Sequence, residues 1–204
     1  MTTPAGAMTA YHDKRDFDRT PEPPGGRRRP HDEPIFVIQK HDAQNLHYDL
    51  RLEIDGVLKS WAVPKGPSTD TADTRLAVPT EDHPLEYADF EGVIPAGQYG
   101  GGTVMVWDTG TIRNLRADKA DDSLTLAESY ADGKIEVWLE GRKLRGGYAL
   151  IRTGAGDEPR WLLKKMADDE ADARRNPTST ETKSALSGRT MAEIATQEAE
   201  PGAR

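Results

Sequence analysis

The chain has 204 residues, 35% of them apolar, a formal net charge of −8 at pH 7 and no cysteine. The lack of cysteine excludes disulfides and thiolate metal sites, so histidine, aspartate and glutamate remain as metal ligands, and a reducing cytoplasm is expected. The negative charge argues against a broad basic surface for nucleic acid, and no apolar run approaches the length of a membrane span.

The first 34 residues differ in composition from the rest of the chain. Residues 1–34 are rich in proline, glycine and charge, and PEPPGGRRRP at 21–30 separates them from the first strong strand. Composition alone therefore predicts a disordered N-terminal arm.

From residue 35 to residue 166 the chain alternates short β-type runs with turn residues. The runs are IFVIQKH, LHYDLRLEI, VLKSWAV, RLAVP, GTVMVW, SLTLAE, KIEVWLE, GYALIRT and WLLKK. Asp55-Gly56 favours a two-residue hairpin turn between the second and third runs, since both central positions need a positive φ. So many short strands predict a mainly β domain over 35–166, a barrel or a sandwich with few short helices.

The C-terminal segment, residues 167–204, is acidic and has few large apolar residues. A segment of this composition lacks the side chains to build a core, so we expect a largely disordered tail. Thr190 and Glu193 match a capping box, which predicts one short helix over MAEIATQ, residues 191–197.

Two histidines and an aspartate cluster near the first predicted hairpin. If 35–41 and 47–54 pair, His41 and His47 face each other with Cβ atoms about 5 Å apart, and Asp49 shares the face of His47. Two histidines and a carboxylate with open coordination positions suit a divalent metal, and manganese, cobalt and zinc all fit such ligands. For this spacing in isolation, a pair of surface histidines beside a structural aspartate is the commoner arrangement.

Further polar residues accompany this cluster. Arg51 extends the same strand face, and its guanidinium matches phosphate oxygens, although a salt bridge with Glu53 or Asp49 is the alternative. His83 has a side chain able to donate a proton or stabilise charge near neutral pH, or it is an ordinary loop histidine. The run IPAGQYGGG, residues 94–102, lacks the lysine of a Walker loop and is interpreted as a tight turn.

Several long motifs occur in one order along the chain. They are YHDKRDFDRTPEP, FVIQKHDAQNLHYDLRLEIDGVLKSWAVPKGPS, RLAVPTEDHPLEYADFEGVIPAGQYGGGTVMVWDTGT, LRGGYALIR and WLLKK, between Tyr11 and Met166. This region resembles the 3′-phosphoesterase domain of bacterial ATP-dependent DNA ligase D, the ligase of nonhomologous end joining. The resemblance implies a compact β-barrel with an active-site groove on one face. It also implies a manganese-dependent enzyme that removes a 3′-terminal ribonucleotide, and then the 3′-phosphate, from DNA ends.

The resemblance also implies roles for individual residues. His41, His47 and Asp49 correspond to metal ligands, and Arg51 and His83 to a catalytic pair that contacts the phosphate. The implied substrate contacts are Arg15, Asp16, Glu22, Gln39, Lys65, Arg75 and Tyr87, of which the first three serve mainly the ribonucleotide step. The resemblance therefore implies that the arm 1–34 folds over the groove, contrary to its composition.

The segment LSGRTMAEIA, residues 186–195, resembles the segment that follows this domain in fused ligases. We therefore expect a stand-alone form, cytoplasmic and associated with the nucleoid during repair, whose ligase and polymerase partners act in trans. Two other functions stay open. A nonheme iron or cupin-like oxygenase also uses two histidines and a carboxylate in a barrel, although Arg51, Lys65, Arg75 and His83 as a set argue against it. A non-catalytic DNA-end-binding module is the second alternative.

Overall fold

The computed structural model describes residues 6, 8–117, 119, 123–154 and 160–198. Its strands are β1 (Ile35–Asp42), β2 (Leu46–Ile54), β3 (Val57–Val63), β4 (Arg75–Pro79), β5 (Gly92–Ile94), β6 (Gly102–Asn114), β7 (Lys134–Gly141), β8 (Arg145–Thr153) and β9 (Arg160–Lys165). Its helices are α1 (Thr9–Asp13), the 3₁₀ helix η1 (Leu85–Asp89), α2 (Leu126–Asp132), α3 (Pro177–Thr180) and α4 (Met191–Glu198).

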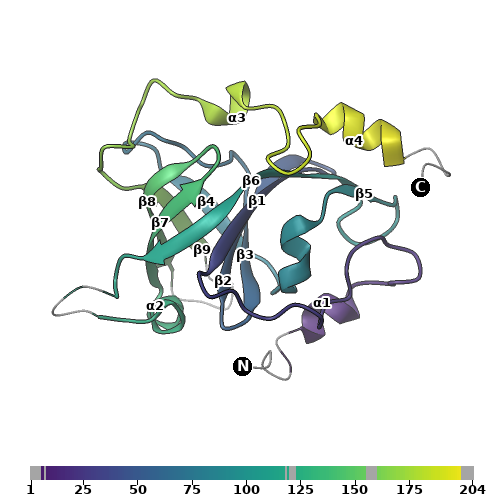
Figure 1. Cartoon of the computed structure of the whole chain (residues 1–204), viewed down its shortest axis with the longest axis horizontal. Helices are drawn as coiled ribbons and strands as arrows, with labels where there is room; N and C mark the ends of the chain where they lie inside the picture. Colours follow the sequence, from purple (N-terminus) through teal and green to yellow (C-terminus); the bar gives the residue numbers. More distant parts are fainter. Residues whose placement is uncertain (1–5, 7, 118, 120–122, 155–159, 199–204) are drawn as a thin grey trace.

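Eight of the strands close into an antiparallel barrel (Figure 1). The order is β1-β2-β3-β4-β9-β8-β7-β6, β1 pairs with β6 to complete the ring, and β5 pairs with β6 outside it. This arrangement confirms the predicted mainly β fold with a few short helices. None of the helices in the described ranges is long and apolar enough to cross a membrane.

The β2–β3 connection has the predicted turn, with φ of 51° at Asp55 and 76° at Gly56. One predicted strand was wrong. The run SLTLAE, residues 123–128, leads into α2, because Thr125 and Glu128 form a capping box in which each bonds the backbone N–H of the other.

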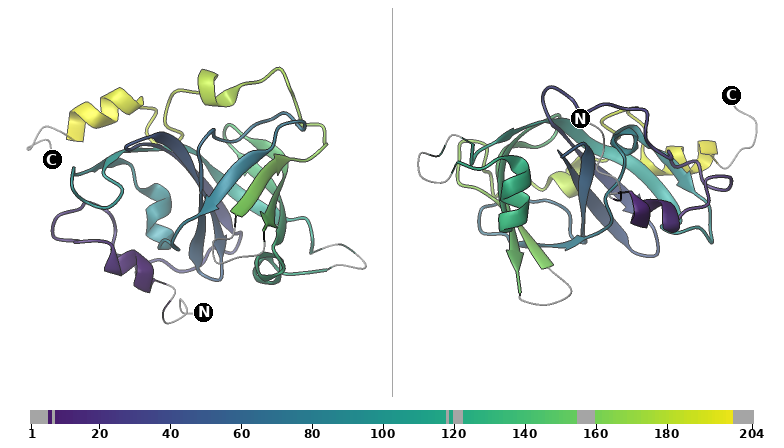
Figure 2. Two further views of the ribbon diagram at one scale, coloured as in Figure 1. Left: turned by 180° about the vertical axis from the view of Figure 1, so that it is seen from behind. Right: turned by 90° about the horizontal axis from the view of Figure 1, so that it is seen from below.

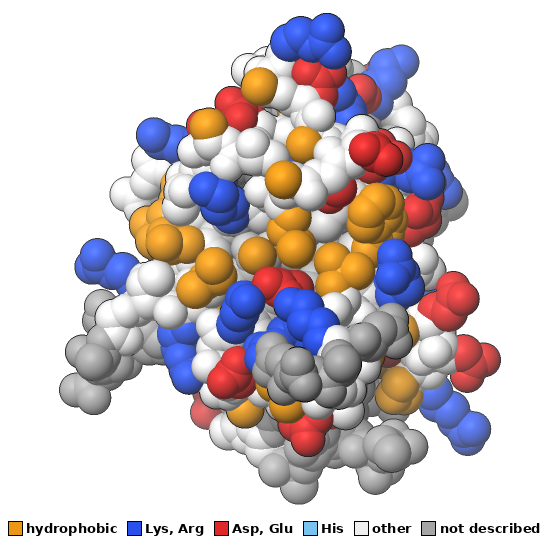
Figure 3. All heavy atoms as spheres, turned by 90° about the vertical axis from the view of Figure 1, so that its left-hand side faces the viewer, with side chains coloured by type: hydrophobic (Ala, Val, Ile, Leu, Met, Phe, Trp, Pro, Cys, Tyr) orange, Lys and Arg blue, Asp and Glu red, His pale blue; other side chains and the backbone are white. Residues whose placement is uncertain are grey.

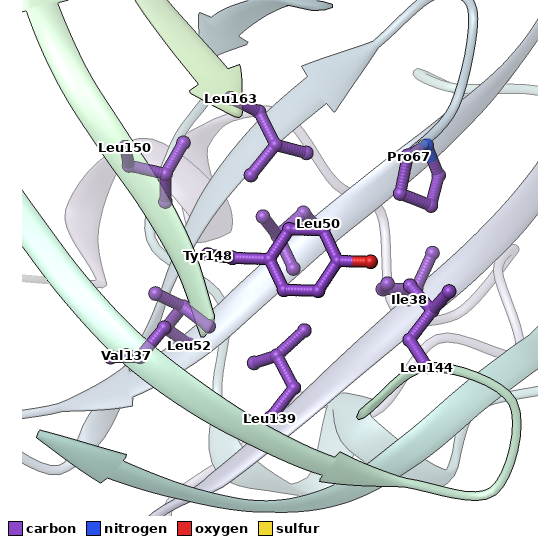
Figure 4. Close-up of a pocket in the computed structure, with 10 residues that line it drawn as sticks. All are labelled: Ile38, Leu50, Leu52, Pro67, Val137, Leu139, Leu144, Tyr148, Leu150 and Leu163. Carbon is purple, nitrogen blue, oxygen red and sulfur yellow. The ribbon is translucent and has the colours of Figure 1, made fainter. Parts of the chain in front are cut away.

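The barrel interior is filled by one set of alternating side chains. Figure 4 shows a small apolar space there, where Leu50 and Leu52 of β2 lie among side chains from other strands, including Tyr148 and Leu163. Because successive strand residues point to opposite faces, Asp49 on the same strand points to the outside of the barrel. The polar cluster of β2 therefore lies on the outer surface of the barrel.

A second apolar cluster lies outside the barrel. It packs α1 and η1, which lie on the same side of the molecule in Figures 1 and 2, against the outer face of the sheet. Its buried members are Tyr11, Val37, Leu58, Leu85, Tyr87, Ala88 and Val106. Tyr11 is completely buried and donates a hydrogen bond to the Pro23 carbonyl (2.7 Å). The composition-based prediction of disorder is wrong for residues 8–34, because this contact with the barrel supplies the burial that the arm alone lacks.

The tail also packs on the barrel, so the prediction of a largely disordered segment was wrong for residues 167–198. Trp107 donates to the Glu181 carbonyl (2.7 Å), Ala185 donates to the Val106 carbonyl (2.8 Å), and Ile194 of α4 is fully buried. Two of these contacts use backbone groups of the tail and the third uses a single apolar side chain, which is why composition does not reveal them. The helix predicted over 191–197 is confirmed as α4; residues 199–204 lie outside the described part.

Charges of both signs alternate on the face shown in Figure 3, where hydrophobic side chains lie between them. This face has no single broad basic surface. This face therefore does not offer an extended basic surface to nucleic acid.

Candidate metal and phosphate site

A pocket of about 270 Å³ opens on the outer face of β1, β2 and β3. It is lined by Arg15, His41, Ala43, His47, Asp49, Arg51, Ala62, Thr80, Glu81, His83, Tyr87, Ile94, Tyr99 and Gly100. The β1–β2 register places His41 directly opposite His47, and Gln39 opposite Asp49. Local hairpin pairing is therefore sufficient to bring the two histidines to one point.

His41, His47 and Asp49 form a possible metal-binding triad, whose ligand atoms all lie within 4.8 Å of one another. Asp49 Oδ2 is 3.6 Å from His41 Nδ1, and Asp49 Oδ1 is 3.7 Å from His47 Nε2. Burial opposes ionisation of Asp49, but Arg51 and the two histidines lower its pKa below the usual value. The carboxylate is therefore the ionised form that a cation needs.

The outer ring nitrogens of both histidines are held by backbone carbonyls. His41 Nε2 donates to the Gly100 carbonyl and His47 Nδ1 to the Asn45 carbonyl, each at 2.8 Å. Since a carbonyl only accepts, these bonds fix the tautomers and leave His41 Nδ1 and His47 Nε2 with free lone pairs beside Asp49. Support of this kind is typical of metal-ligating histidines, so the residues present fit a divalent cation.

Arg51 is almost fully buried beside the triad. Its Nε donates to Gln39 Oε1 (2.8 Å), its Nη1 to Ser60 Oγ (2.9 Å) and its Nη2 to Asp49 Oδ2 (3.2 Å). Of the two expected salt bridges, the one with Asp49 is present, whereas the Glu53 carboxylate accepts from His31 instead. The guanidinium is therefore fixed in orientation while it lines the pocket.

His83 is also buried, and each of its ring nitrogens lies near a guanidinium. Nδ1 is 2.9 Å from Arg51 Nη1 and 2.8 Å from the Glu81 carbonyl oxygen, and Nε2 is 3.3 Å from Arg15 Nη2. Burial, followed by Arg51 and Arg15, holds the pKa of His83 well below its usual value. His83 is therefore a neutral imidazole at neutral pH, which differs from the titration near neutral pH considered from the sequence.

A buried network joins the arm to the barrel beside His83. Arg15 donates to Glu22 (2.8 Å) and to Glu81 (3.0 Å), and Glu22 also accepts from the Tyr87 hydroxyl (2.9 Å). Gln39 donates to the Tyr87 carbonyl (3.0 Å). The arm thus contributes Arg15 to the pocket wall and Glu22 to the layer behind it.

Comparison with known families settles which family this site belongs to. A family model described as the DNA ligase D 3′-phosphoesterase domain matches residues 39–152, more than half of the chain. This chain belongs to the DNA ligase D 3′-phosphoesterase domain family.

Curated relatives of this family extend the match over most of the chain. The multifunctional non-homologous end joining protein LigD of Pseudomonas aeruginosa is 46% identical over 202 residues, which cover 97% of this chain and 23% of that protein. The corresponding DNA repair protein LigD of Mycobacterium tuberculosis is 47% identical over 167 residues, 81% of this chain and 20% of that protein. The chain thus spans less than a quarter of the length of these LigD proteins.

Five of the site residues inferred from the resemblance do not line the pocket. Glu22 and Gln39 lie behind it, bonded to Arg15 and Arg51, whereas Asp16, Lys65 and Arg75 make no such contact with a lining residue in the described part of the chain. Asp16 and Lys65 are exposed, and Asp16 accepts a bond from the Asp18 N–H within its own turn. Arg75 is the first residue of β4 and forms a salt bridge with Asp73 (2.7 Å). In the strand register it lies opposite the core residue Leu163 of β9. The structure therefore separates these three from the residues gathered around the triad.

The structure also adds pocket residues that sequence reasoning missed. Glu81 lies in a charged loop, and its carboxylate binds both Lys14 and Arg15 at 3.0 Å. Tyr99 and Gly100 belong to the glycine-rich run that was interpreted only as a turn. The sequence signal that could have identified Tyr99 is that it is the single aromatic residue within this run.

Proposed function

We propose that this chain is a metal-dependent phosphoesterase that heals DNA 3′ ends. It removes a 3′-terminal ribonucleotide to leave a 3′-phosphate, and then removes the phosphate to leave a 3′-hydroxyl. The observation that supports this function best is the position of Arg51, which contacts Asp49 of the triad at 3.2 Å and His83 at 2.9 Å within one pocket. The triad alone would also suit nonheme iron, whereas a buried arginine and a neutral histidine fixed beside it provide the donors that a phosphate needs.

The proposed metal is manganese, held by His41, His47 and Asp49, and the same ligands suit cobalt and zinc. When bound there, a divalent cation would supply positive charge to neutralise phosphoryl oxygens and to activate water for attack. The chain's own contribution is an ionised Asp49 and two histidines held in the ligating tautomer.

Arg51 binds the non-bridging oxygens of the phosphate in this proposal. Its bonds to Gln39 and Ser60 hold the guanidinium before substrate arrives, so little reorganisation is needed as negative charge develops. Gln39 is therefore a positioning residue for Arg51.

His83 is the proposed second catalytic residue. Because its pKa lies well below the usual value, it enters the reaction as a neutral imidazole. A neutral imidazole between two arginines hydrogen-bonds to the phosphate and takes up a proton as the negative charge of the substrate enters the pocket.

The arm is proposed to act mainly on the ribonucleotide. Arg15 lines the pocket, and Glu22 fixes both Arg15 and Tyr87. Asp16, Lys65 and Arg75 lie outside the pocket lining, so we propose that they contact the DNA beyond the reacting end.

A 3′-hydroxyl end is the substrate that a ligase or a polymerase needs, and such an end-joining enzyme is the proposed partner. The relatives are named as non-homologous end joining proteins, which supports this assignment. The proposed location is the cytoplasm, at the nucleoid during repair.

A 5′-labelled primer-template with one 3′-terminal ribonucleotide tests the function. With protein and manganese, we expect conversion through a 3′-phosphate to a 3′-hydroxyl, resolved on a denaturing gel and abolished by chelator and by His47→Ala. No conversion by folded, metal-loaded protein would reject the function. In that case, binding of 3′-phosphate ends without turnover would indicate the end-binding module, whereas oxygen-dependent chemistry would indicate the oxygenase.

A further inference from the structure

Tyr99 exposes a large aromatic ring at the mouth of the pocket. Its exposed fraction is 48%, whereas Tyr87 and Tyr11, the other tyrosines beside the site, are 2% and 0% exposed. The other large apolar side chains that the described residues expose do not line the pocket; they are Leu46, Leu76, Val78, Ile151 and Leu186. An exposed ring in this place is thus a surface feature of the site and contributes little to the core.

The backbone holds Tyr99 close to the metal-binding triad. Tyr99 lies in the loop between β5 and β6, and the carbonyl of the next residue, Gly100, accepts the hydrogen bond that fixes His41. Ile94 and Ala43 line the pocket with it. One side of the mouth is therefore apolar and aromatic and lies directly beside the ligands.

Positive groups from the arm border the same ring. Lys14 Nζ lies 3.2 Å from the Tyr99 hydroxyl and 4.6 Å from the ring centre, and Arg15 lies 5.5 Å from the ring centre. Glu81 forms an ion pair with each of the two cations at 3.0 Å and so holds them beside the ring. An aromatic face combined with cations is the arrangement that binds single nucleotides, because the base stacks on the ring and the cations attract the phosphates.

We propose that Tyr99 is a stacking platform for the terminal nucleobase of the DNA 3′ end, with Lys14 beside it on the arm. The inference rests on the proposed function, since it assumes that a 3′-terminal phosphate lies between Arg51 and the triad. Stacking depends little on base identity, because every base has a π-face. The platform therefore allows an end-healing enzyme to bind any terminal nucleotide without sequence preference.

The first test measures stacking directly. A DNA duplex with 2-aminopurine as the 3′-terminal nucleotide is titrated with the full chain in the presence of chelator, and its fluorescence is recorded. We expect quenching by the wild type and by Tyr99→Phe, which keeps the ring, and loss of quenching with Tyr99→Ala. Leu186→Ala, which truncates an equally exposed side chain remote from the pocket, is the matched control and retains quenching.

The second test is kinetic and uses two 3′-phosphate ends, one with a terminal base and one with an abasic sugar. We expect Tyr99→Ala to raise KM about tenfold for the end with a base, the size of one stacking contact. For the abasic end we expect an unchanged KM, and for both ends an unchanged kcat. An equal loss on both ends would overturn the proposal, because Tyr99 would then act on the phosphate or on the loop.

The two tests separate this inference from the proposed function. Quenching that depends on Tyr99, in a protein that releases no phosphate, would reject the function and retain the platform. Turnover by a wild type whose quenching does not need Tyr99 would reject the platform and retain the function.

Discussion

Arg51 and His83 are joined side chain to side chain, with Arg51 Nη1 2.9 Å from His83 Nδ1. The same guanidinium contacts Asp49 through Nη2 at 3.2 Å. One buried cation thus links the triad of His41, His47 and Asp49 to His83, so a change at Arg51 affects both halves of the site.

Arg51→Lys tests this link. Lysine keeps the positive charge, but its donors share one nitrogen, whereas Gln39, Ser60 and Asp49 are bonded by three separate nitrogens of the planar guanidinium. We expect kcat/KM for 3′-phosphate release to fall by about 100-fold or more, the usual effect of losing a fixed charged donor. Arg113→Lys is the control and should match the wild type, because Arg113 is exposed near the C-terminal end of β6 and does not line the pocket. A kcat/KM within twofold of the wild type for Arg51→Lys would contradict the role of the guanidinium fork.

His47→Ala tests the triad. Loss of a residue that only hydrogen-bonds to a metal ligand already weakens metal binding by about 10- to 100-fold, so loss of a ligand itself should exceed that range and abolish both activities. Isothermal titration with manganese, cobalt and zinc measures the affinity. His12→Ala removes an exposed histidine of α1 outside the pocket and should leave metal binding unchanged. Full activity of purified His47→Ala would exclude the metal assignment.

Glu22→Ala tests the arm. The change removes the carboxylate that accepts from Arg15 and Tyr87, so the arm loses its fixed position. We expect the rate of ribonucleotide removal to fall about tenfold more than the rate of 3′-phosphate removal. A loss of about tenfold is the size expected when one hydrogen bond to a charged group is removed. Rates on the two substrates are compared with those of Glu33→Ala, an exposed glutamate of the same arm. Equal losses in both reactions would count against a sugar-contacting arm.

Deletion of residues 170–204 tests whether the tail contributes to the stability of the protein and not to catalysis. Their deletion should leave kcat/KM intact, because none of the pocket-lining residues comes from this segment. Stability should fall, and Ile194→Ala alone should lower the free energy of unfolding by about 2–5 kcal/mol. Chemical denaturation measures this loss, and Leu186→Ala, on an exposed tail residue, should change it by less than about 0.5 kcal/mol. A folded but inactive deletion variant would show that the tail belongs to the site.

The protonation of His83 gives a pH prediction for the metal-free protein. Burial, Arg51 and Arg15 lower the pKa of His83 in the folded state, whereas the unfolded chain has an ordinary histidine pKa of about 6.5. Above pH of about 6.5 both states are neutral, and His83 contributes nothing to the pH dependence of stability. As the pH falls below that value the unfolded state binds the proton first, so His83 lowers the free energy of unfolding.

The pKa of His83 can be measured by NMR from the Cε1–H resonance, assigned with His83→Asn. We expect His83 to titrate well below the ordinary histidine pKa of about 6.5. We also expect a smaller loss of stability between pH of about 6.5 and 5 in His83→Asn than in the wild type. A His83 resonance that titrates at its ordinary value would contradict the neutral imidazole.

Much of the barrel, and the proximity of His41, His47 and Asp49, could be predicted from the alternation of side chains and from local strand pairing. The pattern of β2 separates Leu50 and Leu52 from Asp49, and the short β1–β2 connection sets His41 opposite His47. Both features depend on neighbours in the sequence, so they can be inferred without knowledge of the fold. The strand predicted over 123–128 failed because a capping box outweighed its β-type composition.

By itself, the sequence determined the mainly β fold, the first hairpin and the triad, because strand periodicity and turn geometry act over a few residues. The residue pattern also singled out Arg51 and His83, and the resemblance to the family assigned them as a catalytic pair. Only the tertiary structure decided that His83 is neutral, that Glu81 and Tyr99 border the pocket, and that the tail packs through Ile194. These features depend on desolvation and on contacts between segments far apart in the chain, and neither composition nor local pattern encodes them.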